Sequence, residues 1–337
     1  MSTIQIAGEE IALGERRQLA LTVAKLYDFT DMKIPVEVVR GQTDGPTLFV
    51  SAAIHGDEIN GVDIVRRLLK HRALKSISGT LIAIPIVNVF GFNDKSRYLP
   101  DRRDLNRSFP GAEHGSLASQ IAHIFRTEIV SKATHGIDLH TGAIHRRNFP
   151  QIRADLSKPD NLKLAKAFGS PVILNASSRD GSLREMVEDQ NIPMLLYEAG
   201  TALRFDKRAS LLGVEGIFNV MRAIGMLPPA KLATKLLPPF IAHSSQWVRA
   251  PISGIFMTDK KLGERVAKGD KLGFITNPFG DYEYTILSPI DGIIIGNSIL
   301  PLANEGDGIY HIAAIADAPR GRRDEELYPY IDPELQE

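Results

Sequence analysis

Two histidines and one glutamate of this 337-residue chain could together hold a metal ion. His55 and Glu58 are the ends of an H-x-x-E motif that follows an apolar run, and His140 lies in the segment HGIDLHTG. Zinc binds imidazole nitrogen and carboxylate oxygen, and a catalytic zinc site combines three such ligands with an open position. The chain has no cysteine, so thiolate ligands and disulfides are excluded. We therefore predict one Zn²⁺ per chain, although these ligand types also accept cobalt, manganese or nickel.

Each of these residues also has an ordinary explanation when its motif is taken alone. Glu58 could simply favour the positive N-terminal end of a helix, with His55 as a polar loop residue. A lone histidine at the end of a strand, such as His140, is more often a surface residue. Asp138 precedes His140 by two positions and shares its strand face, so it could orient the imidazole or simply line the site.

Glu198 is the candidate for proton transfer. It follows the apolar run of residues 194–197, and a carboxylate at the tip of a buried strand is costly unless it is used or paired. Beside a metal, Glu198 would accept a proton from the attacking water and pass it to the leaving amine. The alternative is an exposed glutamate at a strand end.

An arginine-rich loop, SRYLPDRRDLNRSFPG, covers residues 96–111. Its candidate residues are Arg97, Arg102, Arg103, Asn106 and Arg107. Arginines beside a metal suit bidentate binding of a substrate carboxylate, and one of them could stabilise an oxyanion. Arg102 and Arg103 are expected mostly at the solvated surface, whereas Asn106 and Arg107 stand in a more constrained apolar context.

The elements that must position these residues alternate between strand and helix. Extended segments are expected over residues 17–23 and 34–39, and buried strands over 47–53, 80–87, 172–175 and 194–197, with another short strand ending at His140. Helices are expected from residue 58 to 69, around 121–129, and over 161–169, 182–189 and 211–224. This alternation predicts an α/β fold, a mostly parallel or mixed sheet with helices on both faces and a crevice where strands end.

A proline-rich stretch over residues 227–239 predicts a domain boundary. We expect an α/β domain with an N-terminal extended segment over residues 1–235, a small all-β domain over 236–318 and a tail over 319–337. The segments APISGIF and SPIDGIII resemble one another, which indicates two similar halves in the all-β part.

The charge balance and hydropathy of the chain limit which classes of binding partner are expected. Lysine plus arginine equals aspartate plus glutamate, at 40 each, so neither nucleic acid nor an anionic membrane is expected as partner. The N-terminal residues lack the apolar segment of a signal peptide, and no run reaches the length of a membrane helix. A cytoplasmic protein is therefore expected. The sequence leaves open whether it is a monomer or a homo-oligomer.

Four motifs, in this order, resemble those of the succinylglutamate desuccinylase/aspartoacylase family of zinc carboxypeptidase-like enzymes. They are AAIHGDEING, DLNRSFPG, IDLHTG and LLYEAG, within a resemblance covering about residues 40–315. The resemblance implies that His55, Glu58 and His140 are zinc ligands and that Glu198 is the general base. It further implies that Asn106 and Arg107 grip the substrate carboxylate and that Arg97 serves the oxyanion, with Arg102 or Arg103 as alternatives.

The C-terminal part separately resembles biotinyl/lipoyl carrier-like domains of the barrel-sandwich type. The hairpin that would carry a modified lysine reads NPFGDYEY and contains no lysine, so the resemblance implies a structural role at the cleft entrance. Family members also place a tyrosine of this part near the substrate, and Tyr282 and Tyr284 are the candidates here.

These features together predict a zinc-dependent amidohydrolase, a deacylase that cleaves a small N-acyl amino acid or a similar small molecule bearing a free carboxylate. The first alternative is a metallocarboxypeptidase acting on peptides or peptidoglycan fragments. The second is a catalytically silent binding protein that keeps the fold. The acyl group and the amine cannot be read from the motifs.

Overall fold

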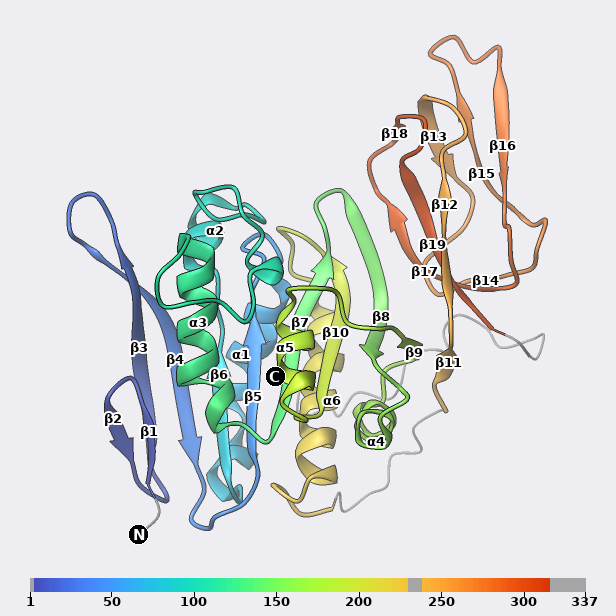
Figure 1. The fold of residues 1–337 in the computed structure, drawn as a ribbon. Coiled ribbons are helices and arrows are strands. Elements are labelled where there is room, and N and C mark those ends of the chain that lie inside the picture. The colour runs from blue at the N-terminus through green and yellow to red at the C-terminus, as the bar shows by residue number, and fades with distance from the viewer. Residues whose placement is uncertain (1–2, 230–237, 316–337) are drawn as a thin grey trace.

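The computed structural model of this chain describes residues 3–229 and 238–315, which form a mixed α/β fold around one large sheet (Figure 1). The predicted boundary at 235/236 and the predicted tail from residue 319 lie outside these residues. Across the two described ranges, no helix combines the length and the apolar character needed to cross a membrane.

Four parallel neighbours form the middle of the 13-stranded sheet, in the order β10-β7-β5-β6. They are β5 (Thr47–Ala52), β6 (Thr80–Ile84), β7 (His135–Gly142) and β10 (Met194–Thr201). Antiparallel strands continue the sheet on both sides, with β4 (Asp31–Arg40) and β3 (Arg16–Lys25) beyond β6, and β8 (Arg146–Ala154) beyond β10. All of β6 is buried, as expected for a parallel strand covered on both faces.

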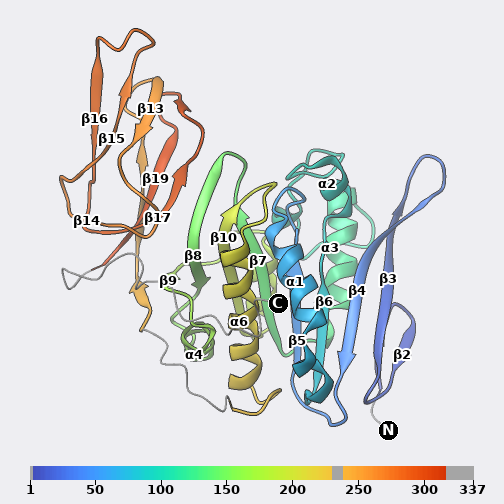
Figure 2. The same ribbon diagram turned by 180° about the vertical axis from the view of Figure 1, so that it is seen from behind.

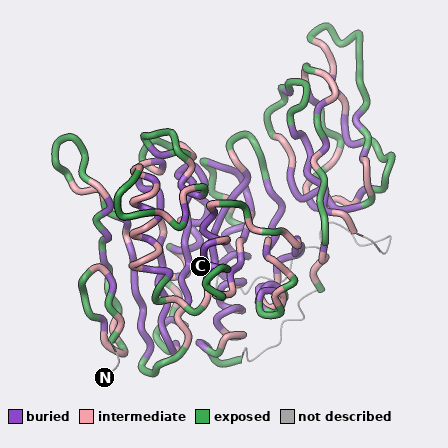
Figure 3. The backbone as a smooth tube through the Cα atoms, viewed as in Figure 1, coloured by how far each residue is buried: buried purple, intermediate pink, exposed green. Residues whose placement is uncertain are grey.

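Helices cover both faces of this sheet, as the strand–helix alternation predicted. α1 (Asn60–Lys70), α4 (Pro159–Phe168) and α6 (Lys207–Ala223) contribute to one apolar core, and Figure 2 shows α1 and α6 in front of the strands. α2 (Val89–Asp94), α3 (Leu117–Glu128) and α5 (Leu183–Asp189) contribute to the core on the other face. Figure 3 shows the buried backbone concentrated in the central strands between these layers.

Local signals set where several helices begin. The side chains of Ser116, Ser182 and Asp206 accept hydrogen bonds from backbone N–H groups in the first turns of α3, α5 and α6. Such caps satisfy N–H groups that have no partner within the helix. Pro159 stands in the first turn of α4, where its missing N–H costs nothing, and Gly169 ends that helix with φ of 83°.

From residue 238 to 315, every regular element of the described chain is a strand. β11 (Phe240–Ala242), β12 (Ser245–Arg249), β14 (Arg265–Val266), β17 (Gly292–Ser298) and β19 (Gly308–Ala314) belong to the large sheet, and so does β9 (Val172–Asn175). A separate four-stranded sheet contains β13 (Gly254–Thr258), β15 (Lys271–Thr276), β16 (Glu283–Leu287) and β18 (Leu302–Ala303). β17 pairs with β8 and β11 pairs with β9, so the C-terminal strands continue the sheet of the α/β part.

The structure differs from the sequence expectations at a few elements. β6 ends at Ile84 rather than at residue 87, and α1 begins at Asn60 because residues 55–59 form turns. The loop after residue 88 contains α2, capped by the side chain of Asn88, and the 3-10 turn η2 (Leu105–Arg107). Unpredicted short elements are β1 (Ile4–Ile6), β2 (Glu9–Ile11), η1 (Arg72–Ser76) and η3 (Val130–Lys132). β8 was not predicted either.

Candidate active site

His55, Glu58 and His140 lie together at the carboxyl ends of β5 and β7. Their ligand atoms all lie within 4.8 Å of one another, and the three side chains are buried. His55 follows β5, Glu58 stands just before α1, and His140 belongs to β7. Because β5 and β7 are parallel neighbours, the residues at their ends meet at one edge of the sheet.

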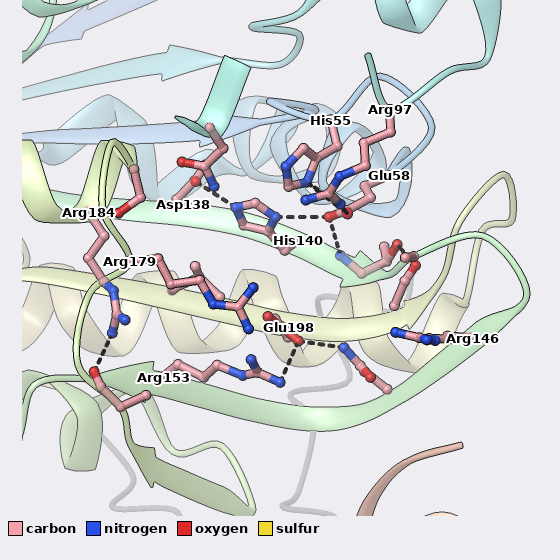
Figure 4. Close-up of a pocket in the computed structure, with 18 of the residues that line it drawn as sticks. His55, Glu58, Arg97, Asp138, His140, Arg146, Arg153, Arg179, Arg184 and Glu198 are labelled. Carbon is pink, nitrogen blue, oxygen red and sulfur yellow. Dashed lines mark hydrogen bonds and ion pairs between the residues drawn. The ribbon is translucent and has the colours of Figure 1, made fainter. Parts of the chain in front are cut away.

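Both imidazoles are held between carboxylates, and Figure 4 shows His140 between Asp138 and Glu58. The Nδ1 atom of His55 is 2.8 Å from Glu58 Oε1, and the Nδ1 atom of His140 is 2.9 Å from Glu58 Oε2. The Nε2 atoms face other acids, at 3.2 Å from Asp104 Oδ1 for His55 and 2.7 Å from Asp138 Oδ2 for His140. Ser51 donates a hydrogen bond to the second oxygen of Asp138 and fixes that carboxylate.

The electrostatics of this cluster favour positive charge at its centre. Burial alone would raise the pKa of Glu58, but the adjacent imidazoles outweigh it and hold that pKa well below its usual range. Burial alone would lower the pKa of His140, but Asp138 and Glu58 outweigh it and raise that pKa well above its usual value. Acids therefore outweigh cations close to the two rings, and a bound cation would offset them.

The donor set fits a divalent metal ion such as zinc. Two imidazole nitrogens and one carboxylate are the ligands of many catalytic zinc sites. Histidine ligands of metals usually donate their second ring N–H to a carboxylate or carbonyl, which fixes the ring and its tautomer. Asp104 and Asp138 occupy those positions beside His55 and His140.

The structure distinguishes among the three candidate arginines of the loop. Arg97 reaches the cluster, with Nη1 3.2 Å from Glu58 Oε1 and Nη2 3.0 Å from Asp104 Oδ2. Arg102 and Arg103 are exposed and do not line the cavity, and Arg103 pairs with Asp101 instead. The predicted alternatives to Arg97 are therefore placed away from the site.

Asn106 and Arg107 occupy η2 at the cavity wall. Asp104 caps this turn by accepting a hydrogen bond from the Asn106 N–H, and Asn106 Oδ1 accepts one from the Leu183 N–H. The Arg107 guanidinium donates to the Asn106 carbonyl, and no described carboxylate lies within ion-pair distance of it. Desolvation lowers the pKa of Arg107, although Asp104 opposes the shift.

Glu198 comes from β10, whose backbone pairs it with His140 of β7. Its side chain lines the same cavity as the His-Glu-His cluster. The Oε2 atom of Glu198 lies 2.5 Å from Asn148 Nδ2 and 3.1 Å from Arg153 Nη2, both on β8. Figure 4 shows Glu198 between Arg153 and the cluster.

The cavity has a volume of about 1220 Å³, and the C-terminal strands form one of its walls. Trp247 of β12 and His311 of β19 stack there with ring centroids 4.4 Å apart, and Arg146 lies 4.8 Å above the indole. Burial lowers the pKa of His311 to about 3, with a further contribution from nearby arginines. Tyr282 and Tyr284, the candidates from the sequence, are exposed and do not line the cavity. The aromatic rings on this wall are instead the indole of Trp247 and the imidazole of His311.

Comparison with known proteins identifies the family of this chain. The family model of the succinylglutamate desuccinylase/aspartoacylase catalytic domain matches residues 44–224, more than half of the chain. The chain belongs to this family.

Relatives match the chain over most of its length. It is 25% identical over 302 residues to N-alpha-acetyl-L-2,4-diaminobutyric acid deacetylase of Halomonas elongata, covering 85% of this chain and 86% of that protein. A succinylglutamate desuccinylase/aspartoacylase from Rhodobacter sphaeroides superposes with a TM-score of 0.79 at 24% identity, covering 90% and 95% of the two chains. The product-bound ectoine utilization protein EutE (DoeB) from Ruegeria pomeroyi gives 0.80 at 24% identity, covering 90% and 97%. These structures share the fold.

Several residues of this family member's cavity were not singled out from the sequence. They are Arg146, Asn148, Arg153, Arg179, Arg184, Trp247 and His311. The β8 residues lie in a strand that the sequence did not reveal, and Trp247 and His311 come from the C-terminal part. An indirect signal existed in the segment RRNFPQIRA, where arginine and amide residues are concentrated beside a few apolar ones.

Proposed function

We propose that this chain is a zinc-dependent deacylase that hydrolyses the amide bond of a small N-acyl amino acid or a similar substrate with a free carboxylate. The observation that carries the proposal is one cavity lined by the His-Glu-His cluster, by Arg97 and by Glu198. Membership of the desuccinylase/aspartoacylase family supports amide hydrolysis, as does the relative named as an N-acetyl diaminobutyric acid deacetylase.

His55, Glu58 and His140 would hold the metal, with Asp104 and Asp138 orienting the two imidazoles. When bound, zinc supplies Lewis-acid chemistry that polarises a carbonyl and makes water a better nucleophile near neutral pH. Burial of the three ligands excludes bulk water from their side of the site and strengthens every charge interaction there.

Glu198 and Arg97 would carry out the remaining work. Glu198 accepts a proton as water oxygen bonds to the acyl carbon, and it gives a proton to the amine nitrogen as the C–N bond breaks. The products are a free carboxylic acid and a free amine. The Arg97 guanidinium is positioned beside Glu58 and would donate to the negative oxygen that develops on the acyl group.

Arg107 and Asn106 would fix the free carboxylate of the substrate. Arg107 has a guanidinium without a carboxylate partner among the described residues, and it faces the cavity beside Asn106. A charge-assisted, bidentate contact between guanidinium and carboxylate fixes orientation as well as charge. This need for an anchor favours N-acyl amino acids over neutral amides.

We also propose that the chain divides as its sequence indicated, into an α/β hydrolase domain over residues 1–235, a β-rich domain of the biotinyl/lipoyl barrel-sandwich type over 236–318, and a tail. The second domain would narrow the entrance through Trp247 and His311 and thereby favour small substrates over peptides. Trp247 and His311 line the cavity, which supports a role of the C-terminal domain in limiting substrate size.

The test is elemental analysis of purified protein together with a panel of N-acetyl and N-succinyl amino acids, their C-terminal amides and short peptides. We expect close to one zinc per chain and hydrolysis of N-acyl amino acids with free carboxylates. Faster hydrolysis of peptides than of N-acyl amino acids would indicate a carboxypeptidase rather than a deacylase. A metal-loaded protein that cleaves neither panel would point to a binding protein.

A further inference from the structure

Two side chains of β8 bind the same oxygen of Glu198. Asn148 Nδ2 lies 2.5 Å and Arg153 Nη2 lies 3.1 Å from Oε2, and both residues line the cavity. Figure 4 shows Arg153 beside Glu198. Within residues 3–229 and 238–315, no hydrogen bond reaches the other carboxylate oxygen, Oε1. One oxygen of Glu198 is therefore anchored, and the other is left for a reacting partner.

An irregularity in the strand pairing makes this double contact possible. Arg153 and Asn148 are five residues apart, and on a regular strand they would point to opposite faces. Glu198 pairs with Gln151 and Gly200 pairs with Asn148, so three steps along β8 match two along β10. The extra residue is a β-bulge, which turns Asn148 to the face that Arg153 already occupies. Pro150 lies within the bulged stretch, where a missing ladder hydrogen bond is tolerated.

The guanidinium of Arg153 depends on Glu198 for its charge pairing. Its side chain is 17% exposed, and Glu198 is the carboxylate within ion-pair distance of it among the described residues. Its buried Nε atom has no hydrogen-bond partner there. The neighbouring Arg147, by contrast, pairs with Asp206 outside this cavity.

We propose that Asn148 and Arg153 are positioning residues that hold Glu198 in a single orientation, with Oε2 fixed by β8 and Oε1 presented to the substrate. A carboxylate at the end of a flexible side chain can otherwise rotate, and proton transfer requires the acceptor within hydrogen-bond reach of the proton. This inference rests on the proposed role of Glu198 as the proton-transfer group. It assigns the orientation of that group to two residues that would not themselves touch the substrate.

Steady-state kinetics of Arg153→Met and Asn148→Ala test the proposal, with Arg147→Met as the matched control. We expect kcat to fall roughly 10- to 100-fold, because misplacing a reacting group by about 1 Å has costs of that order. KM should change little, Arg147→Met should resemble the wild type, and Arg153→Lys should recover part of kcat. A raised KM with unchanged kcat would assign Arg153 to substrate binding and overturn the proposal.

A double-mutant cycle separates positioning from any independent effect. In a Glu198→Ala background, Arg153→Met should cost little further activity, because the group that it positions is already absent. An undiminished additional loss would overturn the inference. Should Arg153→Met fail to fold, Arg153→Gln and Asn148→Ser weaken the same contacts while keeping a polar side chain at each position.

A crystal structure gives a readout that does not depend on activity. In the wild type, Glu198 Oε2 should contact Asn148 and Arg153, and in the Arg153→Met, Asn148→Ala double variant the carboxylate should rotate or occupy several conformers. An unchanged, ordered Glu198 in the double variant would overturn the positioning role. A wild type that cleaves no substrate of the panel would refute the proposed function alone, and the two crystal structures would still decide the orientation of Glu198.

Discussion

His140 Nδ1 lies 2.9 Å from Glu58 Oε2, although 82 positions separate the two residues in the chain. Parallel pairing of β5 with β7 brings them together, since Ala52 is the register partner of Leu139 and both residues stand just before the segment that carries the ligands. The sheet register therefore brings the end of β5 beside His140, and the turns of residues 55–59 then place His55 and Glu58 next to it.

Replacing His140 should release the metal. His140→Ala removes one of three proposed ligands and leaves Glu58 and Asp138 without their shared imidazole. We expect the zinc content to fall from about one per chain to near zero after dialysis, with activity lost in parallel. His135→Ala, on the same strand but outside the cavity, is the control and should keep its metal. Full zinc occupancy in His140→Ala would rule out this ligand set.

Glu198→Ala should keep the metal and lose most turnover. Glu198 lines the cavity without belonging to the His-Glu-His cluster, so zinc content should match the wild type. Loss of general acid–base catalysis typically costs about 10²- to 10⁴-fold in rate, and kcat should fall within that range. Glu264→Gln, in the C-terminal part, serves as the control. Full activity of Glu198→Ala would exclude the proposed proton transfer.

Arg107→Met should weaken the binding of substrates through their carboxylate. Hydrogen bonds to charged groups contribute about 1.5 to 3 kcal/mol, so kcat/KM for an N-acyl amino acid should fall by roughly 10- to 150-fold. The corresponding C-terminal amide, already a poor substrate, should be affected much less. Arg103→Met removes an exposed arginine of the same loop and should leave both rates unchanged. An equal loss of kcat/KM for the N-acyl amino acid and for its amide would mean that Arg107 does not bind the substrate carboxylate.

Trp247→Ala should widen the cavity entrance. The indole lines the wall, where it stacks on His311 beneath Arg146. We expect kcat/KM for dipeptides to rise relative to that for N-acetyl amino acids, because removal of the ring leaves room for a longer chain. The measurement is the ratio of kcat/KM for a dipeptide to kcat/KM for an N-acetyl amino acid, in the variant and in the wild type. An unchanged ratio would mean that this wall does not select for size.

His311 should make the fold sensitive to acid. Its folded-state pKa of about 3 lies below the ordinary value of 6.5, because burial and then Arg153, Arg179 and Arg146 disfavour the charged ring. The unfolded chain therefore binds the proton first, and the free energy of unfolding falls as pH drops from 6.5 toward 3.

His311→Phe should lack this contribution while keeping an aromatic ring beside Trp247. Between pH 7.5 and pH 5, the wild type should lose about 2 kcal/mol more unfolding free energy than the variant, as measured by urea titration. Parallel losses in the two proteins would show that the imidazole at position 311 does not titrate as inferred.

Much of the central sheet could be predicted because its strands are apolar runs that end at polar motifs. β9 has the bounds that the sequence indicated, and β5 differs from its predicted range by one residue. β8 could not be predicted in the same way. Pro150 stands in its middle, its cavity-facing residues are polar, and its bulge breaks the alternation by which strands are recognised.

The site was predictable where residues close in sequence carry the chemistry. The motif containing His55 and Glu58 and the motif containing His140 each pointed to ligands, and the sheet brings them together. Arg153 and Trp247 gave no such signal, since their positions depend on tertiary pairing of β8 with β10 and of β12 with β19. A residue outside any recognisable motif gives no sign in the sequence of the strand pairing that brings it to the site.

The pairing of β17 with β8 and of β11 with β9 has a consequence for how this protein can be altered. Ladder hydrogen bonds join the C-terminal strands directly to β8 and β9, so the C-terminal part is not an independent module that could be exchanged. Truncation before β11 would remove the strands that pair with β8 and β9. It would leave unpaired strand edges near Glu198, and such edges promote aggregation. Variation in substrate size is therefore more accessible through side chains such as Trp247 than through replacement of the C-terminal part.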